Sequence, residues 1–265
     1  MAAARGRERY AGAHMLHPIR IVVLGGVLAA AACGGGSPSI AGPTPGVPVT
    51  NTEDANAILA RCPTPAEVAA ADRDLTLLFD YDVTAAGRVC TAAQSSRDLT
   101  LLQAQTYRVL TIMRRLTFDA PLPWTTSPVY TWMVSSIRGI RYRGDEIVNS
   151  FCCDPSGIIN VKATLGPNNS GLAALLFPTD FRAVGTLLVL FVHEARHNNG
   201  LPHSCADGVN DKTIAELGAW GVQYYLDLFM AGRAEPSFIA AAARTGFTQD
   251  AQQVCSTRFC ADHCP

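Results

Sequence analysis

A dense run of apolar residues occupies positions 187–192, inside a segment from 183 to 198 that has the composition of a helix. A helix that is apolar on nearly all sides lies inside a domain. The polar residues of this segment are gathered at its end, where His193, Glu194 and His197 stand. Because buried polar groups need partners, the pattern predicts a buried helix that brings these three side chains together around a ligand or a hydrogen-bond network.

Other segments show weaker patterns of helices and short strands. Residues 95–115 carry apolar positions at helical spacing after Ser95 and Asp98, which suit capping, and residues 127–137 and 213–230 are predicted as further helices. Residues 139–143 and 158–163 have the β-branched character of short strands. No internal repeat and no second linker interrupts the chain. These patterns predict a predominantly helical α+β fold in a single domain over residues 53–265.

The first 32 residues have the pattern of a signal peptide. Four arginines precede an apolar run at positions 21–32, which is too short to span a bilayer. The run ends on Ala30-Ala31-Ala32-Cys33, which resembles the lipobox of bacterial lipoproteins. That resemblance implies a lipid on Cys33 as the only membrane attachment, a flexible linker over residues 33–52, and an exported protein anchored in the bacterial cell envelope. The alternative is plain cleavage by an ordinary signal peptidase.

Charge and composition exclude some classes of function. Hydrophobic residues make up 48% of the chain, as in ordinary globular proteins. Loss of the signal peptide would remove four arginines and Glu8, which changes the formal net charge from −1 to −4. No basic patch remains, so nucleic acid is not expected as a partner.

Nine cysteines are typical of a protein from an oxidising compartment. With Cys33 set aside for lipid, an even number is left, enough for four disulfides. We expect Cys205 to pair with Cys152 or Cys153, because such a bond would hold the loop after His203. The alternative use of Cys255, Cys260 and Cys264 is a second metal site with His263. The eight cysteines are Cys62, Cys90, Cys152, Cys153, Cys205, Cys255, Cys260 and Cys264.

The end of the predicted buried helix carries a metal-binding pattern, His193-Glu194-Ala195-Arg196-His197 followed by Asn198-Asn199-Gly200-Leu201-Pro202-His203. Histidines four residues apart lie on one face of a helix, so both imidazoles can reach one ion. A glycine at position 200 can adopt positive φ and turn the chain so that a third histidine returns to the ion. Three protein ligands leave the fourth position of a zinc ion open, as in catalytic sites.

These eleven residues resemble the motif H-E-x-x-H-x-x-G-x-x-H of the metzincin clan of zinc metallopeptidases. The resemblance implies a zincin-like catalytic domain in which His193, His197 and His203 bind Zn²⁺ and Glu194 is the general base. The expected reaction is hydrolysis of a peptide bond in a peptide or protein substrate: zinc acidifies its bound water and polarises the carbonyl, and the glutamate moves the proton.

The sequence leaves alternatives open for the third ligand, the function and the substrate. Glu216 follows His197 at a distance similar to that of the glutamate ligand in gluzincins, and would then replace His203; it also fits a capping box that begins at Thr213. Asp207 and Asp211 are lesser ligand candidates. A zinc-binding cell-envelope lipoprotein without catalysis is the alternative function, although such a protein needs no base. The substrate could also be cell-wall peptide.

One arginine and three aromatic residues lie near the motif in the sequence. Arg196 is expected to anchor the end of the motif helix through a salt bridge. Trp220, Tyr224 and Tyr225 are spaced to line one side of the next helix, most simply as core residues. A hydroxyl of one of these tyrosines could instead assist an oxyanion.

Overall fold

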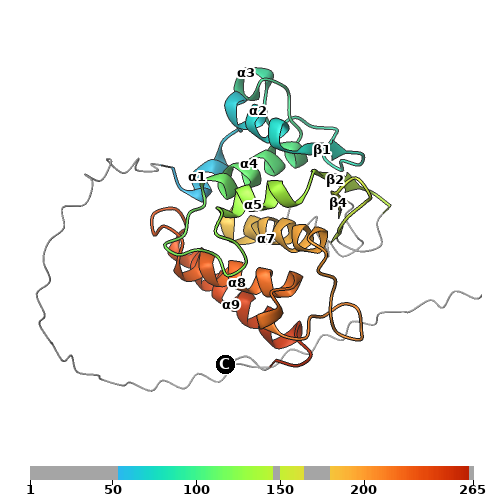
Figure 1. The fold of residues 1–265 in the computed structure, drawn as a ribbon. Helices are drawn as coiled ribbons and strands as arrows, with labels where there is room; N and C mark the ends of the chain where they lie inside the picture. The colour runs from blue at the N-terminus through green and yellow to red at the C-terminus, as the bar shows by residue number, and fades with distance from the viewer. Residues whose placement is uncertain (1–52, 146–149, 164–179, 263–265) are drawn as a thin grey trace, which may run out of the picture. The chain divides into compact units, whose positions relative to one another are not determined.

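The computed structural model describes residues 53–145, 150–163 and 180–262, which form eight α-helices and one small sheet (Figure 1). The predicted signal peptide, Cys33 and the linker that ends at residue 52 lie outside these ranges, and so do His263 and Cys264. The helices are α1 (Ala55–Ala60), α2 (Pro65–Asp74), α3 (Ala92–Ser95), α4 (Leu101–Arg115), α5 (Val129–Ser136), α7 (Phe181–Asn198), α8 (Ala219–Gly232) and α9 (Ala241–Thr257). The predicted α+β class, predominantly helical, is confirmed.

The sheet has four strands in the order β1-β2-β4-β3: β1 (Thr76–Phe79), β2 (Gly139–Arg143), β4 (Ile158–Lys162) and β3 (Ser150–Phe151). The strand β2 pairs in parallel with both β1 and β4, whereas the short edge strand β3 runs antiparallel to β4. The two strands predicted from the sequence are β2 and β4. The unpredicted β3 contacts α7, so the edge of the sheet lies beside the helix that carries the metal-binding pattern.

The central helix of the molecule is α7, as the apolar run predicts. It contacts α4 and α5 on one side and α8 and α9 on the other (Figure 1). Leu187, Leu188 and Val192 have no exposed surface. A Cβ atom at Gly185 would lie 2.6 Å from the ring of Phe247, so only glycine lets α9 pack this closely. This close contact sets the position of α7 against α9.

The helix predicted over residues 95–115 is two helices. Ser95 is the last residue of α3, and Ser96 adopts a left-handed backbone with φ of 67° that ends it. The predicted cap Asp98 accepts a hydrogen bond from the Ala92 backbone at the start of α3. Thr100 instead caps α4, through a capping box with Gln103. The prediction was wrong about the start because the polar residues before α4 serve the preceding short helix.

The helix predicted over residues 213–230 is also broken. A 3₁₀ turn, η1 (Ile214–Glu216), ends at Leu217, whose φ is 50°, and α8 begins at Ala219. Thr213 makes no side-chain cap, so the predicted capping box is absent. The Asp211 carboxylate accepts a hydrogen bond from the Trp220 backbone at 2.9 Å and serves the first turn of α8 instead.

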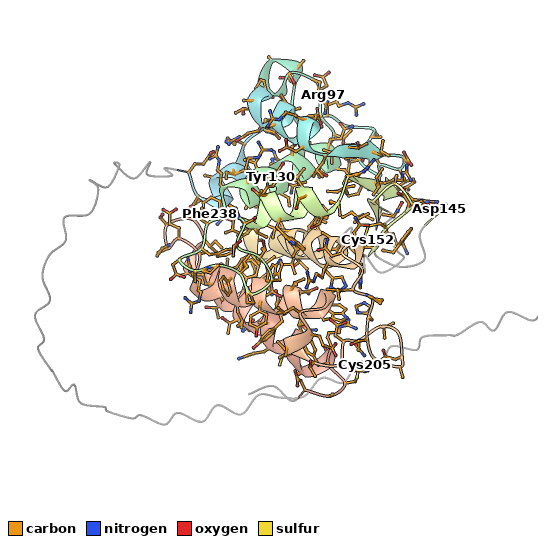
Figure 2. The ribbon with its side chains drawn as sticks, in the orientation of Figure 1. Arg97, Tyr130, Asp145, Cys152, Cys205 and Phe238 are labelled. Carbon is orange, nitrogen blue, oxygen red and sulfur yellow. A yellow bond between two sulfur atoms is a disulfide. The ribbon has the colours of Figure 1, made fainter. Side chains whose placement is uncertain are left out.

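Three disulfides join described cysteines: Cys62–Cys90, Cys152–Cys153 and Cys205–Cys260. The expected bond from Cys205 to Cys152 or Cys153 is wrong, because those two neighbours pair with each other. Figure 2 shows Cys152 and Cys205 on separate loops. The Cys205–Cys260 bond still holds the loop after His203, since it ties that loop to the segment that follows α9. Because Cys260 is used in this way, it is not a ligand of the alternative second metal site.

No helix within the three described ranges is long and apolar enough to cross a membrane.

Candidate metal centre

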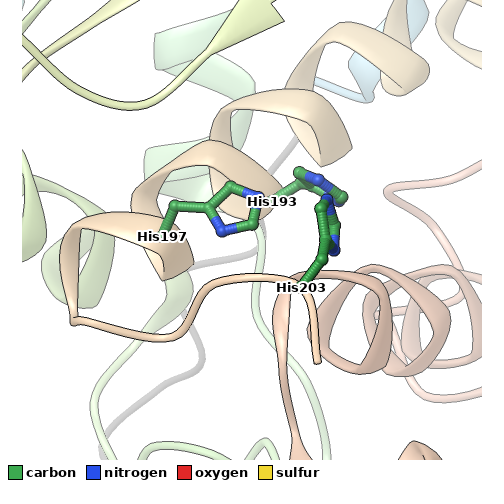
Figure 3. A group of neighbouring side chains, drawn as sticks. All are labelled: His193, His197 and His203. Atoms are coloured by element: carbon green, nitrogen blue, oxygen red, sulfur yellow. The ribbon is translucent and has the colours of Figure 1, made fainter. Parts of the chain in front are cut away.

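Three histidines meet at the end of α7. His193 and His197 project from its last two turns, and His203 approaches from the loop that follows (Figure 3). One ligand atom from each ring can be chosen so that all three atoms lie within 4.8 Å of one another, an arrangement that could hold a metal ion. The described histidines, cysteines and acidic residues contain no other group of this kind.

The loop returns to the helix because Gly200 takes a left-handed backbone. Its φ is 80°, and its N–H donates to the carbonyl of His197 at 3.0 Å. An added Cβ would meet no atom within 4 Å, so the requirement for glycine is conformational and not steric. The predicted positive φ of this glycine is confirmed.

Two of the rings are held by hydrogen bonds at Nδ1, which leaves Nε2 of each ring available for a metal ion. Nδ1 of His197 lies 2.9 Å from the carbonyl oxygen of Leu201, and Nδ1 of His203 lies 2.9 Å from Oδ1 of Asp211. Histidine ligands usually donate their second ring N–H to a carbonyl or carboxylate in this way, because the bond fixes the tautomer and leaves the other nitrogen free for the metal. The sequence suggested Asp211 as a lesser ligand, whereas the structure places it behind a histidine.

A tryptophan packs against the cluster. The Trp220 ring lies 4.3 Å from that of His193, centroid to centroid, and stacks on His203 at 5.8 Å with an interplanar angle of 17°. Its indole N–H donates to the carbonyl of Val209, so the ring is anchored at both ends. Trp220 therefore limits how far the two imidazoles can turn. Tyr224 and Tyr225 contact each other, but they do not line the cavity of the cluster.

Burial keeps the histidines in the form that binds metals. Burial is the main cause that lowers the pKa of His193, and the positive charge of a protonated neighbouring histidine adds to the effect. Burial also lowers the pKa of His197, partly offset by the hydrogen bond to Leu201. Neutral imidazole is the form that binds a metal. The protein therefore favours this form of both rings before any ion is added.

Glu194 lies beside the cluster and is 4% exposed. Its Oε1 accepts a hydrogen bond from the Ser150 hydroxyl at 2.7 Å, and the Cys152 backbone contributes another to the carboxylate. Burial raises the pKa of this carboxyl, while those two hydrogen bonds and His203 oppose the rise. Nothing in the sequence pointed to Ser150, which the edge strand β3 brings to the site.

Two buried polar atoms at the site have no hydrogen-bond partner in the described part of the chain: Oε2 of Glu194 and Nδ1 of His193. Buried polar atoms are rarely left without partners. Buried polar atoms without partners next to three converging imidazoles fit a site built for an ion and a polar ligand. Three imidazoles with carbonyl and carboxylate support are also the donor set of catalytic zinc sites.

The cluster opens into a cavity of about 780 Å³. Its walls include the apolar side chains of Phe151, Leu190 and Val209, together with Gln223, which also bonds to His193. Arg258 lines the same cavity from the segment after α9. Neither Gln223 nor Arg258 had a signal in the sequence.

The competing candidates of the sequence lie elsewhere. Glu216 accepts a hydrogen bond from the Ser204 hydroxyl at 2.5 Å and does not belong to the cluster. Asp207 holds its own loop through the Val209 and Asn210 backbones. Arg196 donates to the carbonyl of Leu217 at 2.7 Å, so the expected anchor of α7 exists, but its partner is a backbone oxygen and not a carboxylate.

Comparisons with protein families, curated proteins and solved structures find no match for this chain.

Proposed function

We propose that the chain is a zinc-dependent peptidase that hydrolyses peptide bonds, with His193, His197 and His203 as the zinc ligands. The observation that carries the proposal is the buried, half-satisfied carboxylate of Glu194 next to the three imidazoles, at the edge of a cavity large enough for part of a peptide. Bound zinc would supply Lewis-acid chemistry, because it acidifies water and polarises a carbonyl group.

Glu194 is the general base and then the general acid in this proposal. Ser150 holds Oε1 at 2.7 Å, which leaves Oε2 to take a proton from the attacking water and return it to the leaving amine. A carboxyl with a raised pKa suits this work, since proton transfer is most efficient when the pKa of the group lies near the working pH.

The test separates the base from the ligands. Glu194→Gln removes the base but no ligand, so zinc content stays at about one ion per chain while kcat on a peptide library falls by about 10²–10⁴-fold. Glu216→Gln is a matched control outside the cluster and should leave both quantities unchanged. If Glu194→Gln stays active, the glutamate does not have this role. If the wild type binds zinc and cleaves no peptide, the alternative of a zinc-binding envelope protein without catalysis is correct.

The proposal also includes export, a lipid on Cys33 as the membrane anchor, and a peptide or protein substrate as partner. The disulfides Cys62–Cys90 and Cys205–Cys260 support an oxidising compartment. Incorporation of labelled fatty acid into the wild type, and its loss in Cys33→Ser, is the expected result. Export with no label in the wild type would favour plain cleavage of the signal peptide.

A further inference from the structure

Arg258 is the one arginine or lysine among the described residues that line the cavity of the histidine cluster. The only acidic side chain on these walls is Glu194, which Ser150 already holds. Most of the remaining walls are apolar or belong to the histidines. A single fixed positive charge in such a cavity selects among ligands by charge.

The guanidinium of Arg258 is stacked, and no described acidic side chain pairs with it. It lies 4.3 Å from the ring centroid of Trp220. Among the described residues its side chain makes no ion pair and donates no hydrogen bond to a carbonyl oxygen. Arg233 occupies the equivalent position at the end of α8, stacks on Phe229 in the same way, and pairs with Asp119 at 3.3 Å. Both arginines end a helix and stack on an aromatic ring, but only Arg233 has a carboxylate partner among the described residues.

The backbone of Arg258 is linked to the histidine cluster through hydrogen bonds. Its N–H donates to Val254 at the end of α9, and its carbonyl accepts from the N–H of Asp211 at 3.1 Å. Asp211 in turn holds His203. Arg258 and His193 line the same cavity.

We propose that Arg258 binds a carboxylate of the peptide substrate and so sets the specificity of the site, an inference that rests on the proposed peptidase function. A guanidinium presents parallel N–H donors that match the two oxygens of a carboxylate, and its stacking on Trp220 orders the fork before the ligand arrives. The carboxylate is either an aspartate or glutamate side chain of the substrate or its free C-terminus.

Two pairs of fluorescent peptides test this. The two peptides of the first pair both end in an amide, and they differ in carrying either Glu or Gln at one internal position. The two peptides of the second pair have no charged side chain, and they differ in ending in either a free carboxylate or an amide. We expect the wild type to favour the carboxylate member of one pair in kcat/KM by roughly 10- to 100-fold, the range for a charge-assisted hydrogen bond. Arg258→Gln should bring that ratio to about one, and Arg258→Lys should retain part of it.

Arg233→Gln is the matched control, since it removes a stacked arginine from a helix end outside the cavity, and it should keep the wild-type ratio. A wild-type ratio of about one in both pairs, or a ratio that survives in Arg258→Gln, overturns the inference. The pair that responds shows whether the carboxylate is a side chain or the C-terminus.

Binding separates this inference from the proposed function. The Kd of each peptide is measured by fluorescence anisotropy on zinc-loaded Glu194→Gln protein, with and without Arg258→Gln. If the wild type cleaves no peptide but the carboxylate peptides bind 10- to 100-fold more tightly through Arg258, the peptidase function fails and the carboxylate site stands. Equal Kd values within both pairs overturn the carboxylate site, whatever the activity of the wild type.

Discussion

The substitution Asp211→Asn tests how the protein holds His203 without touching a ligand. Asp211 is 1% exposed, and its two oxygens accept from different donors: Oδ1 from Nδ1 of His203 and Oδ2 from the Trp220 backbone, both at 2.9 Å. Asparagine has nearly the same volume but only one oxygen. One of the two donors must therefore lose its acceptor.

The new amide can take two orientations. One opposes metal binding by His203, and the other weakens the start of α8. If the amide NH₂ faces His203, it can donate only to an unprotonated Nδ1, which moves the ring proton to Nε2 and blocks the nitrogen that faces the cluster. If the oxygen stays with His203, the first turn of α8 at Trp220 loses its acceptor, at a cost of about 1–3 kcal/mol. Loss of such a supporting partner lowers metal affinity by about 10- to 100-fold.

The assay is a zinc competition titration against a chromophoric chelator at fixed pH, together with a thermal melt of the metal-free protein. Asp74→Asn is the control, because Asp74 accepts hydrogen bonds from Arg114 and Tyr130 away from the cluster and should cost stability without changing zinc affinity. The reasoning would be refuted if Asp211→Asn protein bound zinc as tightly as the wild type and also melted at the wild-type temperature, because one of the two donors must lose its acceptor.

Three further outcomes are expected. His203→Ala should weaken zinc binding strongly in the chelator titration and Glu216→Ala should not; the reverse order would support the gluzincin-like ligand set. Ser150→Ala should lower kcat by about 10-fold at unchanged zinc content, because one oxygen of Glu194 is no longer held; an unchanged kcat would contradict this. Burial, and then the charge of Asp250, raises the pKa of Asp227 well above its ordinary 3.8. The folded chain therefore keeps a proton that the unfolded chain releases, so this contribution to stability is full below the unfolded pKa and is lost as the pH rises through the folded one. Asp227→Asn should thus raise Tm at pH 8 and have little effect near pH 4; a gain independent of pH would exclude the explanation.

The parts of the site that were predictable from the sequence depend on local geometry. Two histidines four residues apart in an apolar helix lie on one face wherever that helix is placed, and Gly200 turns the chain because of its own backbone freedom. His203 follows His197 by only six residues, so the short loop between them limits how far His203 can lie from the other two histidines.

The remaining parts depend on contacts between distant segments, which spacing cannot reveal. Ser150 reaches Glu194 from an edge strand of two residues, and Arg258 reaches the cavity through the packing of α9 against α8. The breaks at Ser96 and Leu217 were also missed, because non-glycine residues with positive φ carry no clear signal in the sequence. At Leu217 a tertiary hydrogen bond from Arg196 to its carbonyl compensates for the unfavourable backbone.

The most direct test of the central claim is an anomalous difference map at the zinc edge from crystals of the mature, oxidised protein. We predict one strong peak, about 2.0–2.1 Å from one ring nitrogen each of His193, His197 and His203. A map without a peak at the cluster, or a peak bound by Glu216 with His203 turned away, would contradict the metal centre described above.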